Sequence, residues 1–259
     1  MLRRGMRGRD LRRLRDMVEG SRRVLVLTGA GVSRASGLPT YRGSGGIYEN
    51  ADIEALHHAE GLPGTLPALW AFWGPRRATI GDAAPNAAHR AIAAFQAESR
   101  ASGREVTLAT QNVDDLHERG GSTQVAHLHG SLFRTRCSDP SCSYGVRDDS
   151  TPYAEPPLCP ECRSTYLRPA VVLFGEPLDV GAQHTARRAV RDCDLLIAAG
   201  TSGEVSTAAM LIRYASDVGA LLMAVDPAES VLPQFDVHVP MPAEVALPQL
   251  LPGQQVAKR

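Results

Sequence analysis

Short apolar runs that end in glycine or polar residues constrain the fold of this chain most strongly. Each run has the length and composition of a buried parallel strand. The runs are Val24–Leu27, Val106–Ala109, Leu195–Ala199 and Leu221–Val225. The stretches between them have helical spacing, at 85–99, 180–191 and 204–217. Strands that alternate with helices predict an α/β fold with a mostly parallel sheet and right-handed crossovers.

Polar residues and glycines follow directly after every predicted strand. The segments are Gly29–Ser33, Thr110–His117, Gly200–Gly203 and Asp226. Ligands of open parallel sheets bind at the carboxyl ends of the strands. We therefore expect these segments to face one crevice.

Two segments interrupt the alternation and predict a smaller second lobe. Residues 47–80 carry aromatic residues at helical spacing, and residues 131–168 carry four cysteines among proline-rich loops. We assign both segments to the small lobe. The large lobe then comprises 1–46, 81–130 and 169–259.

The four cysteines form a C-x4-C pair and a C-x2-C pair separated by sixteen residues. They are Cys137, Cys142, Cys159 and Cys162. Two close thiolate pairs of this spacing are typical of a tetrahedral Zn²⁺ site, and four sulfur ligands leave no position for water, so the metal is expected to be structural. The alternatives are two disulfides or unrelated buried cysteines, and the leftover Cys193 disfavours a disulfide framework.

The charge balance excludes a strong bulk attraction to nucleic acid or membranes, because 28 basic residues match 28 acidic ones. No apolar run approaches the roughly 20 residues of a membrane span, so we expect a cytoplasmic protein. Nine arginines lie within residues 1–23, where Leu11, Leu14 and Val18 recur at helical spacing. We interpret this segment as a docked amphipathic helix with a solvated basic face.

Three segments carry residues suited to chemistry. The turn Gly29–Ser33 follows a strand, as a phosphate-binding turn does, but it lacks the third glycine of G-x-G-x-x-G and is equally consistent with a tight turn. Thr110–His117 gathers amides and carboxylates that suit ribose hydroxyls and carboxamides. His127 and His129 are candidate general bases, and their spacing does not choose between them.

These segments together resemble a known family, the NAD-dependent protein deacylases called sirtuins. Gly29–Ser33 with Ser36–Pro39 and Tyr41–Arg42 is similar to the signature GAG-x-S-x-x-SGIP-x-FR, and Thr110–His117 is similar to TQN-I-D-x-LH. Further matches are His129–Gly130, the four cysteines, Arg168–Glu176 and Gly200–Ser202 with Val205. The resemblance covers roughly residues 20–240.

The resemblance implies a Rossmann-like lobe beside a smaller lobe with zinc and helices, and NAD and an acyl-lysine that enter the cleft from opposite sides. It also implies that the acyl oxygen displaces nicotinamide and that His129 activates the ribose 2′-hydroxyl. The activated hydroxyl attacks the resulting imidate, and water completes the reaction to free lysine and 2′-O-acyl-ADP-ribose. Asn112 and Asp114 complete the implied catalytic set.

The resemblance further implies two sets of binding residues. The set for NAD is Gly29, Ala30, Gly31, Ser33, Tyr41, Arg42, Gln111, Asn112, Asp114, Gly200, Thr201, Ser202 and Asp226. The set for the acylated substrate is Trp73, Arg76, Val172, Phe174, Gly175, Glu176, Gly203 and Val205. We expect an acyl-lysine protein as partner, and a monomer.

Several residues depart from the family pattern. Tyr41 replaces a phenylalanine, Leu173 a tryptophan and Thr207 a proline, while Asp226 replaces an asparagine and should favour NAD over NADP. Family members that remove succinyl and malonyl groups carry a Tyr-x-x-Arg pair, where this chain has Trp73 and Arg76. Arg76 is therefore a candidate reader of an acidic acyl group, and a merely exposed Arg76 beside a core Trp73 is the alternative.

Two other functions fit parts of the sequence. A protein ADP-ribosyltransferase would use the same co-substrate, and a non-catalytic zinc-ribbon module would bind nucleic acid through residues 3–23. A binding module has no need for a base beside an amide and carboxylate pocket, which favours an enzyme.

Overall fold

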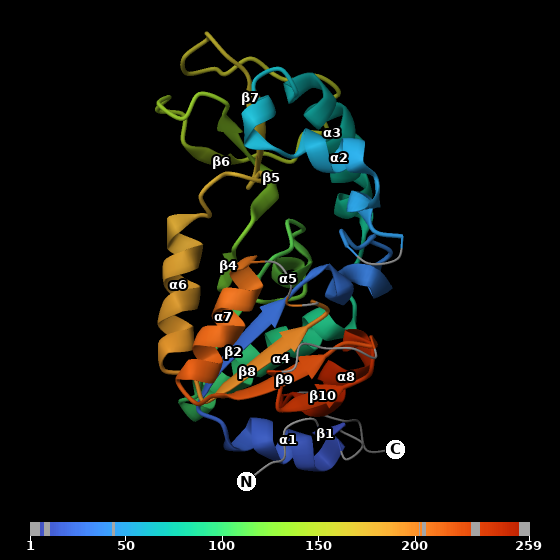
Figure 1. The fold of residues 1–259 in the computed structure, drawn as a ribbon, viewed down its shortest axis with the longest axis vertical. Coiled ribbons are helices and arrows are strands. Elements are labelled where there is room, and N and C mark those ends of the chain that lie inside the picture. Colours follow the sequence, from blue (N-terminus) through green and yellow to red (C-terminus); the bar gives the residue numbers. More distant parts are fainter. Residues whose placement is uncertain are drawn as a thin grey trace.

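The structure is a computed structural model that describes residues 6–7, 11–42, 45–201, 203, 206–228 and 234–253. Its larger part is a seven-stranded parallel sheet in the order β1-β10-β9-β8-β2-β3-β4 (Figure 1). The strands are β1 (Met6–Arg7), β2 (Arg23–Thr28), β3 (Glu105–Thr110), β4 (Val125–His127), β8 (Leu195–Ala199), β9 (Leu221–Val225) and β10 (Val237–Val239). The four predicted strands are confirmed. The strands β1, β4 and β10 have only two or three residues each, too few to show a pattern in the sequence.

Helices cover both faces of this sheet because its central strands are apolar on both sides. Val24 and Val26 of β2 pack with α1 (Leu11–Gly20), α4 (Ala87–Ser102) and α8 (Ala243–Leu250). Leu25 and Leu27 pack on the other face with α6 (Val180–Arg191) and α7 (Ser206–Asp217). The three predicted interstrand helices and the N-terminal helix are thus confirmed. The rest of the expected N-terminal tail lies outside the described residues, except β1, which pairs with β10.

The smaller part combines a three-stranded antiparallel sheet with helices. Its strands are β5 (Gly130–Cys137), β6 (Val146–Asp148) and β7 (Leu167–Val171), in the order β6-β5-β7. The helices are α2 (Ala51–Leu56) and α3 (Leu66–Asp82), with short 3₁₀ helices at Ile47–Glu49 and Ala59–Gly61. Figure 1 shows this part at the end of the molecule opposite α1. Aromatic residues of α3 pack on Leu132, Val171 and Leu173.

The division into two lobes remains a proposal, and three of its boundaries cut through regular elements. The boundary at 130/131 falls after the first residue of β5. The boundary at 80/81 falls inside α3, and the boundary at 168/169 falls inside β7. β7 pairs only with β5 among the described strands. The proline-rich composition before it hides this strand in the sequence. Among the described residues, no helix is long and apolar enough to span a membrane.

Candidate active site

The glycine turn after β2 packs directly against the turn after β8. The Gly29 amide donates to Ala199 O at 3.1 Å, and the Gly31 amide donates to Gly200 O at 2.9 Å. A Cβ on Gly29 would lie 2.7 Å from Gly200 O, and one on Gly31 would lie 2.7 Å from Gly200 Cα. Only glycine fits at these two positions. The element that follows, Ala30–Ser36, is a 3₁₀ helix rather than the α-helix usual after such turns.

Three polar side chains from two strand ends form a buried network. Ser33 Oγ donates to Asp114 Oδ2 at 3.0 Å, and Asn112 Nδ2 donates to Ser33 Oγ at 3.2 Å. Asp114 Oδ1 accepts from the Leu116 amide at 3.1 Å. Burial raises the pKa of Asp114, while these hydrogen bonds lower it in part. Asn112 Oδ1 is buried and has no partner among the described residues, so it is free to accept from a ligand.

A second set of buried polar residues, at the ends of β2 and β3, holds the backbone of Asn112. Thr28 Oγ1 donates to Thr110 Oγ1 at 2.9 Å, and the Asn112 amide donates to the same Thr110 oxygen at 3.0 Å. His117 Nε2 lies 2.9 Å from Thr28 Oγ1. The sequence predicts a role for the segment Thr110–His117, but it predicts neither Thr28 nor His117 as an individual site residue. Thr28 directly precedes the glycine turn, and this position was the one available signal.

The structure distinguishes the two candidate histidines by their partners. His129 Nδ1 lies 3.0 Å from Gln111 O, and a carbonyl can only accept, so Nδ1 carries the proton and Nε2 the lone pair. Burial lowers the pKa of His129, and the hydrogen bond to Gln111 offsets part of this effect. His129 is therefore neutral at pH 7, with one ring nitrogen free to accept a proton.

His127 has acceptors at both ring nitrogens. Nε2 lies 2.7 Å from Glu118 Oε1, and Nδ1 lies 3.1 Å from Asn112 O. Burial alone would lower its pKa, but the hydrogen bond and charge of Glu118, the hydrogen bond to Asn112 O and the charge of Asp114 together raise it. His127 therefore has no free lone pair with which to act as a base.

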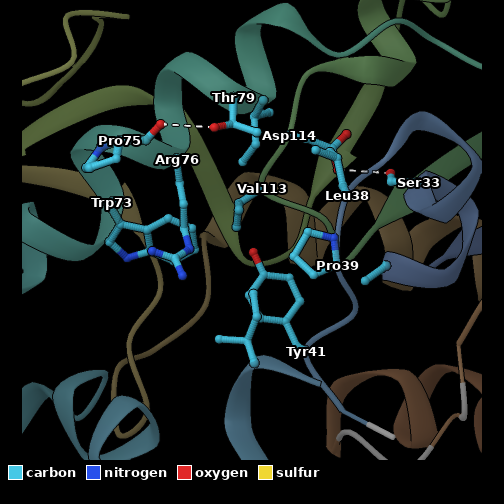
Figure 2. Close-up of a pocket in the computed structure, with 13 residues that line it drawn as sticks. Ser33, Leu38, Pro39, Tyr41, Trp73, Pro75, Arg76, Thr79, Val113 and Asp114 are labelled. Carbon is cyan, nitrogen blue, oxygen red and sulfur yellow. Dashed lines mark hydrogen bonds between the residues drawn. The ribbon is translucent and has the colours of Figure 1, made fainter. Parts of the chain in front are cut away.

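A pocket of about 350 Å³ joins the polar network to α3 (Figure 2). Ser33 and Asp114 line it, as do Tyr41, Trp73 and Arg76. Its remaining wall comprises Ala30, Leu38, Pro39, Ile47, Pro75, Thr79, Ile80 and Val113. Trp73 is 2% exposed and its Nε1 has no partner among the described residues. The sequence does not predict this mostly apolar wall, because its residues come from four separate segments.

Arg76 is held at the pocket by Phe72. Its Nη1 donates to Phe72 O at 2.8 Å, and its guanidinium carbon lies 3.6 Å from the centre of the Phe72 ring. The side chain is half-buried. Burial lowers the pKa of its guanidinium, and the nearby Tyr41 offsets part of this effect. Trp73 and Arg76 thus line one pocket, as their spacing of three predicts for a helix.

Other predicted ligand residues lie at the same edge of the sheet with different partners. Gln111 Nε2 donates to Thr201 Oγ1 at 2.9 Å and so joins the turns after β3 and β8. Asp226, at the end of β9, accepts from the Ala228 amide at 2.8 Å and is partly exposed. Arg42 instead forms an ion pair with Glu54 of α2, with 3.6 Å between Nη2 and Oε1. Ser202 and Val205 lie outside the described residues.

The loop after β7 is fixed to both parts of the molecule. The Val172 amide donates to His129 O at 2.9 Å, and the Phe174 amide donates to His57 O at 2.8 Å. The carboxylate of Glu176 accepts from the Leu173 amide at 3.0 Å and forms an ion pair with buried Arg168. Glu176 therefore braces the loop with its side chain, and exposed Gly175 has a positive φ of 87°.

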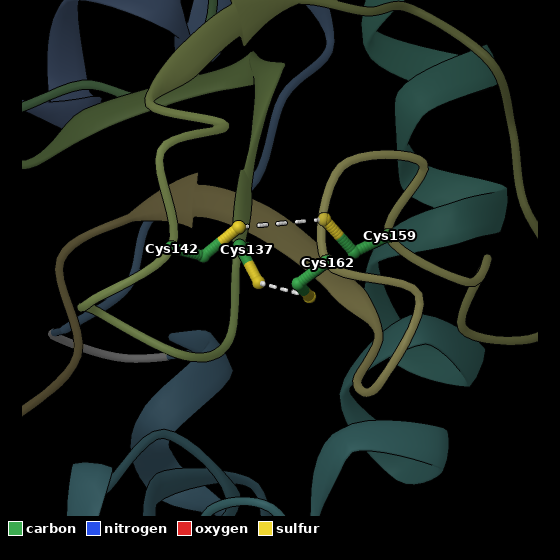
Figure 3. A group of neighbouring side chains, drawn as sticks. All are labelled: Cys137, Cys142, Cys159 and Cys162. Atoms are coloured by element: carbon green, nitrogen blue, oxygen red, sulfur yellow. Dashed lines mark hydrogen bonds between the residues drawn. The ribbon is translucent and has the colours of Figure 1, made fainter.

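The four predicted cysteine ligands converge at the far end of β5 (Figure 3). Their sulfur atoms all lie within 4.8 Å of one another, and the Cys137–Cys162 and Cys142–Cys159 pairs are each separated by 3.8 Å. A tetrahedral ion with Zn–S bonds of about 2.3 Å places its sulfurs roughly 3.8 Å apart. The cluster can therefore hold one zinc ion without rearrangement.

The fold and site together define a class of protein, a parallel α/β nucleotide-binding protein with a four-cysteine module and a candidate histidine base. The Sir2 family model matches residues 29–207. The chain belongs to the Sir2 family, the family that its motifs resemble.

Individual proteins show the same relationship. The chain is 41% identical over 226 residues to NAD-dependent protein deacylase 1 of Pseudomonas aeruginosa, covering 84% of this chain and 88% of that protein. A solved Sir2 homologue in complex with NAD superposes with a TM-score of 0.82 at 36% identity, over 92% of this chain and 91% of the other. A Sir2 variant with deacetylated p53 peptide and 3′-O-acetyl-ADP-ribose superposes with a TM-score of 0.81 at 26% identity, over 93% and 96%.

Proposed function

We propose that this protein removes acyl groups from lysine side chains of other proteins and consumes NAD in doing so. The products would be free lysine, nicotinamide and 2′-O-acyl-ADP-ribose. The observation that carries this proposal is the free Nε2 of His129, held by Gln111 O close to the buried network of Asn112, Ser33 and Asp114. The deacylase names and ligands of the related proteins support it.

The residues of the network fit NAD. The unpartnered Asn112 Oδ1 would accept from a ribose hydroxyl, and Asp114 would accept from the nicotinamide carboxamide. The turns at Gly29–Gly31 and Gly200–Thr201 would hold the phosphates, because their missing side chains let a ligand approach the backbone. Asp226 would accept from the adenosine ribose. Bound NAD supplies an electrophilic ribose carbon and nicotinamide as its leaving group.

His129 would act as the general base. Its Nε2 would take the proton of the ribose 2′-hydroxyl, while Nδ1 keeps the ring oriented on Gln111 O. A base with a lowered pKa is in its neutral form at pH 7, as the step requires. Asn112 would hold the same ribose in place through its side chain.

The acylated protein would bind as an extended segment beside the loop after β7. Phe174, Gly175 and Glu176 on one side and Gly203 on the other would supply backbone groups for an added strand. Val172, which is joined to His129 O, would line the path of the acyl-lysine. Arg76 would pair with the distal carboxylate of succinyl or malonyl groups. The bacterial relatives favour action in the cytoplasm, as the sequence predicts.

The test is incubation with an acetyl-lysine peptide, with and without NAD, followed by mass spectrometry of every product. We expect deacetylated peptide and O-acetyl-ADP-ribose in equal amounts, and none without NAD. Incorporation of ADP-ribose into protein without deacetylation would establish the alternative activity, a protein ADP-ribosyltransferase.

A further inference from the structure

The pocket has an unused hydroxyl opposite Arg76. Tyr41 lines the pocket together with Trp73 and Arg76, and its ring centre lies 6.5 Å from that of Trp73. Figure 2 shows the Tyr41 hydroxyl pointing into the space between these side chains and Val113. Among the described residues this hydroxyl makes no hydrogen bond. It is a donor that a ligand can use.

Tyr41 shares the pocket wall with two charged residues. It interacts electrostatically with Arg76 and with Asp114, which also line the pocket. Asp114 already accepts two hydrogen bonds from Ser33 and the Leu116 amide. A second carboxylate would therefore be repelled at that end and attracted at the Arg76 end. The unpartnered indole N–H of Trp73 lies at the same end.

We infer that Tyr41 determines acyl specificity, and that its hydroxyl donates a hydrogen bond to the distal carboxylate of a dicarboxylic acyl group held by Arg76. This inference rests on the proposed deacylase function. It adds a second residue that recognises the distal carboxylate, from a different segment of the chain than Arg76. Trp73 of α3 offers an unpartnered indole N–H, and Tyr41 adds a hydroxyl to the same pocket from a different segment. Burial raises the pKa of Tyr41, which keeps the hydroxyl protonated and able to donate.

The neighbouring Tyr48 provides a matched control. Its ring centre lies 5.4 Å from that of Tyr41, and it is a tyrosine of the same aromatic cluster. It does not belong to the pocket wall. Tyr48→Phe therefore removes a hydroxyl nearby without removing a donor from the pocket.

The experiment measures kcat/KM for succinyl-lysine and acetyl-lysine peptides of one sequence with wild type, Tyr41→Phe, Tyr48→Phe and Arg76→Met. We expect Tyr41→Phe to lower the succinyl-to-acetyl ratio about 10-fold, the effect of a hydrogen bond to a charged group. Arg76→Met should lower it further, and Tyr48→Phe should keep the wild-type ratio. An unchanged ratio in Tyr41→Phe, or an equal loss in Tyr48→Phe, would overturn the inference.

A second measurement needs no variant. The distal carboxylate of the succinyl peptide is replaced by an amide of the same shape, and wild type should turn this peptide over about 10-fold more slowly. Equal rates for the two peptides contradict the inference. Acetyl-lysine turnover is measured in parallel, so loss of the specificity signal with intact deacetylation leaves the proposed function standing.

Discussion

At the scale of single residues, the hydrogen-bond partners of the His127 and His129 imidazoles decide which of the two can take a proton. His129 donates from Nδ1 to a carbonyl and keeps a lone pair on Nε2. His127 donates to the Asn112 carbonyl and to the Glu118 carboxylate, so the imidazolium form is stabilised. The two histidines are separated by one residue, yet the pKa of His129 is lowered and that of His127 is raised from the ordinary histidine value.

We therefore predict two separate titrations by NMR. The pKa of His129 should lie below 6.5, because burial penalises the charged ring. That of His127 should lie above 6.5, because Glu118, Asn112 O and Asp114 together stabilise the charged ring more than burial penalises it. The base form of His129 then predominates at pH 7 and is lost as the pH falls through this lowered pKa. The C2 proton resonances, assigned with His127→Gln, report both values, and the reverse order would contradict the assignment of roles.

The sequence predicts most residues of the candidate site, but not their hydrogen-bond partners or protonation states. Asn112, Asp114 and His129 lie in short motifs, so adjacency along the chain suffices to find them. The choice between His127 and His129 depends on Glu118 and Gln111, which approach only after folding. Tyr41 and Arg76 come from separate segments, and nothing in their spacing predicts a shared pocket.

At the scale of elements, buried Arg77 joins α3 to the antiparallel sheet. Arg77 is 1% exposed and donates to Leu132 O at 2.8 Å, to Thr151 O at 2.7 Å and to Arg134 O at 3.2 Å. Its guanidinium carbon lies 4.8 Å from the centre of the Trp70 ring. The next residue towards the N-terminus is Arg76, which lines the pocket, so this contact also fixes the α3 side of the pocket.

We predict that Arg77→Met lowers the free energy of unfolding by about 3 kcal/mol, because three backbone carbonyls around the buried guanidinium lose a charged donor. Arg191→Met is the control. Arg191 pairs with Asp192 at 3.6 Å on the surface, and exposed pairs contribute at most about 1 kcal/mol. Urea denaturation of both variants measures the difference. An equal, small loss in both would show that Arg77 does not join the elements.

At the scale of the whole molecule, β5 connects the metal site to the catalytic crevice. The strand begins at Gly130, next to His129, and ends at the ligand Cys137. It also supplies two of the carbonyls that Arg77 binds. A zinc ion held by the four cysteines would stabilise this strand at one end, far from the chemistry at the other.

We predict that Cys159→Ser lowers metal content, melting temperature and activity together. Cys159 is fully buried, and a structural zinc ion contributes its binding energy to folding. Metal content by atomic emission, differential scanning calorimetry and the acetyl-lysine assay report the three quantities. Cys193→Ser, which changes a buried thiol outside the cluster, is the control for the loss of a sulfur. A metal-free Cys159→Ser protein that melts and reacts like wild type would refute the structural role of zinc.

The most direct test of NAD-dependent deacylation with His129 as the base is a comparison of His129→Ala with His127→Ala. Both are assayed with acetyl-lysine peptide and NAD, with NAD binding measured by calorimetry. We predict that His129→Ala binds NAD but loses about 10²–10⁴ in kcat, the usual effect of removing a general base, while His127→Ala keeps most of its activity. Full activity in His129→Ala, or the larger loss in His127→Ala, would contradict this account.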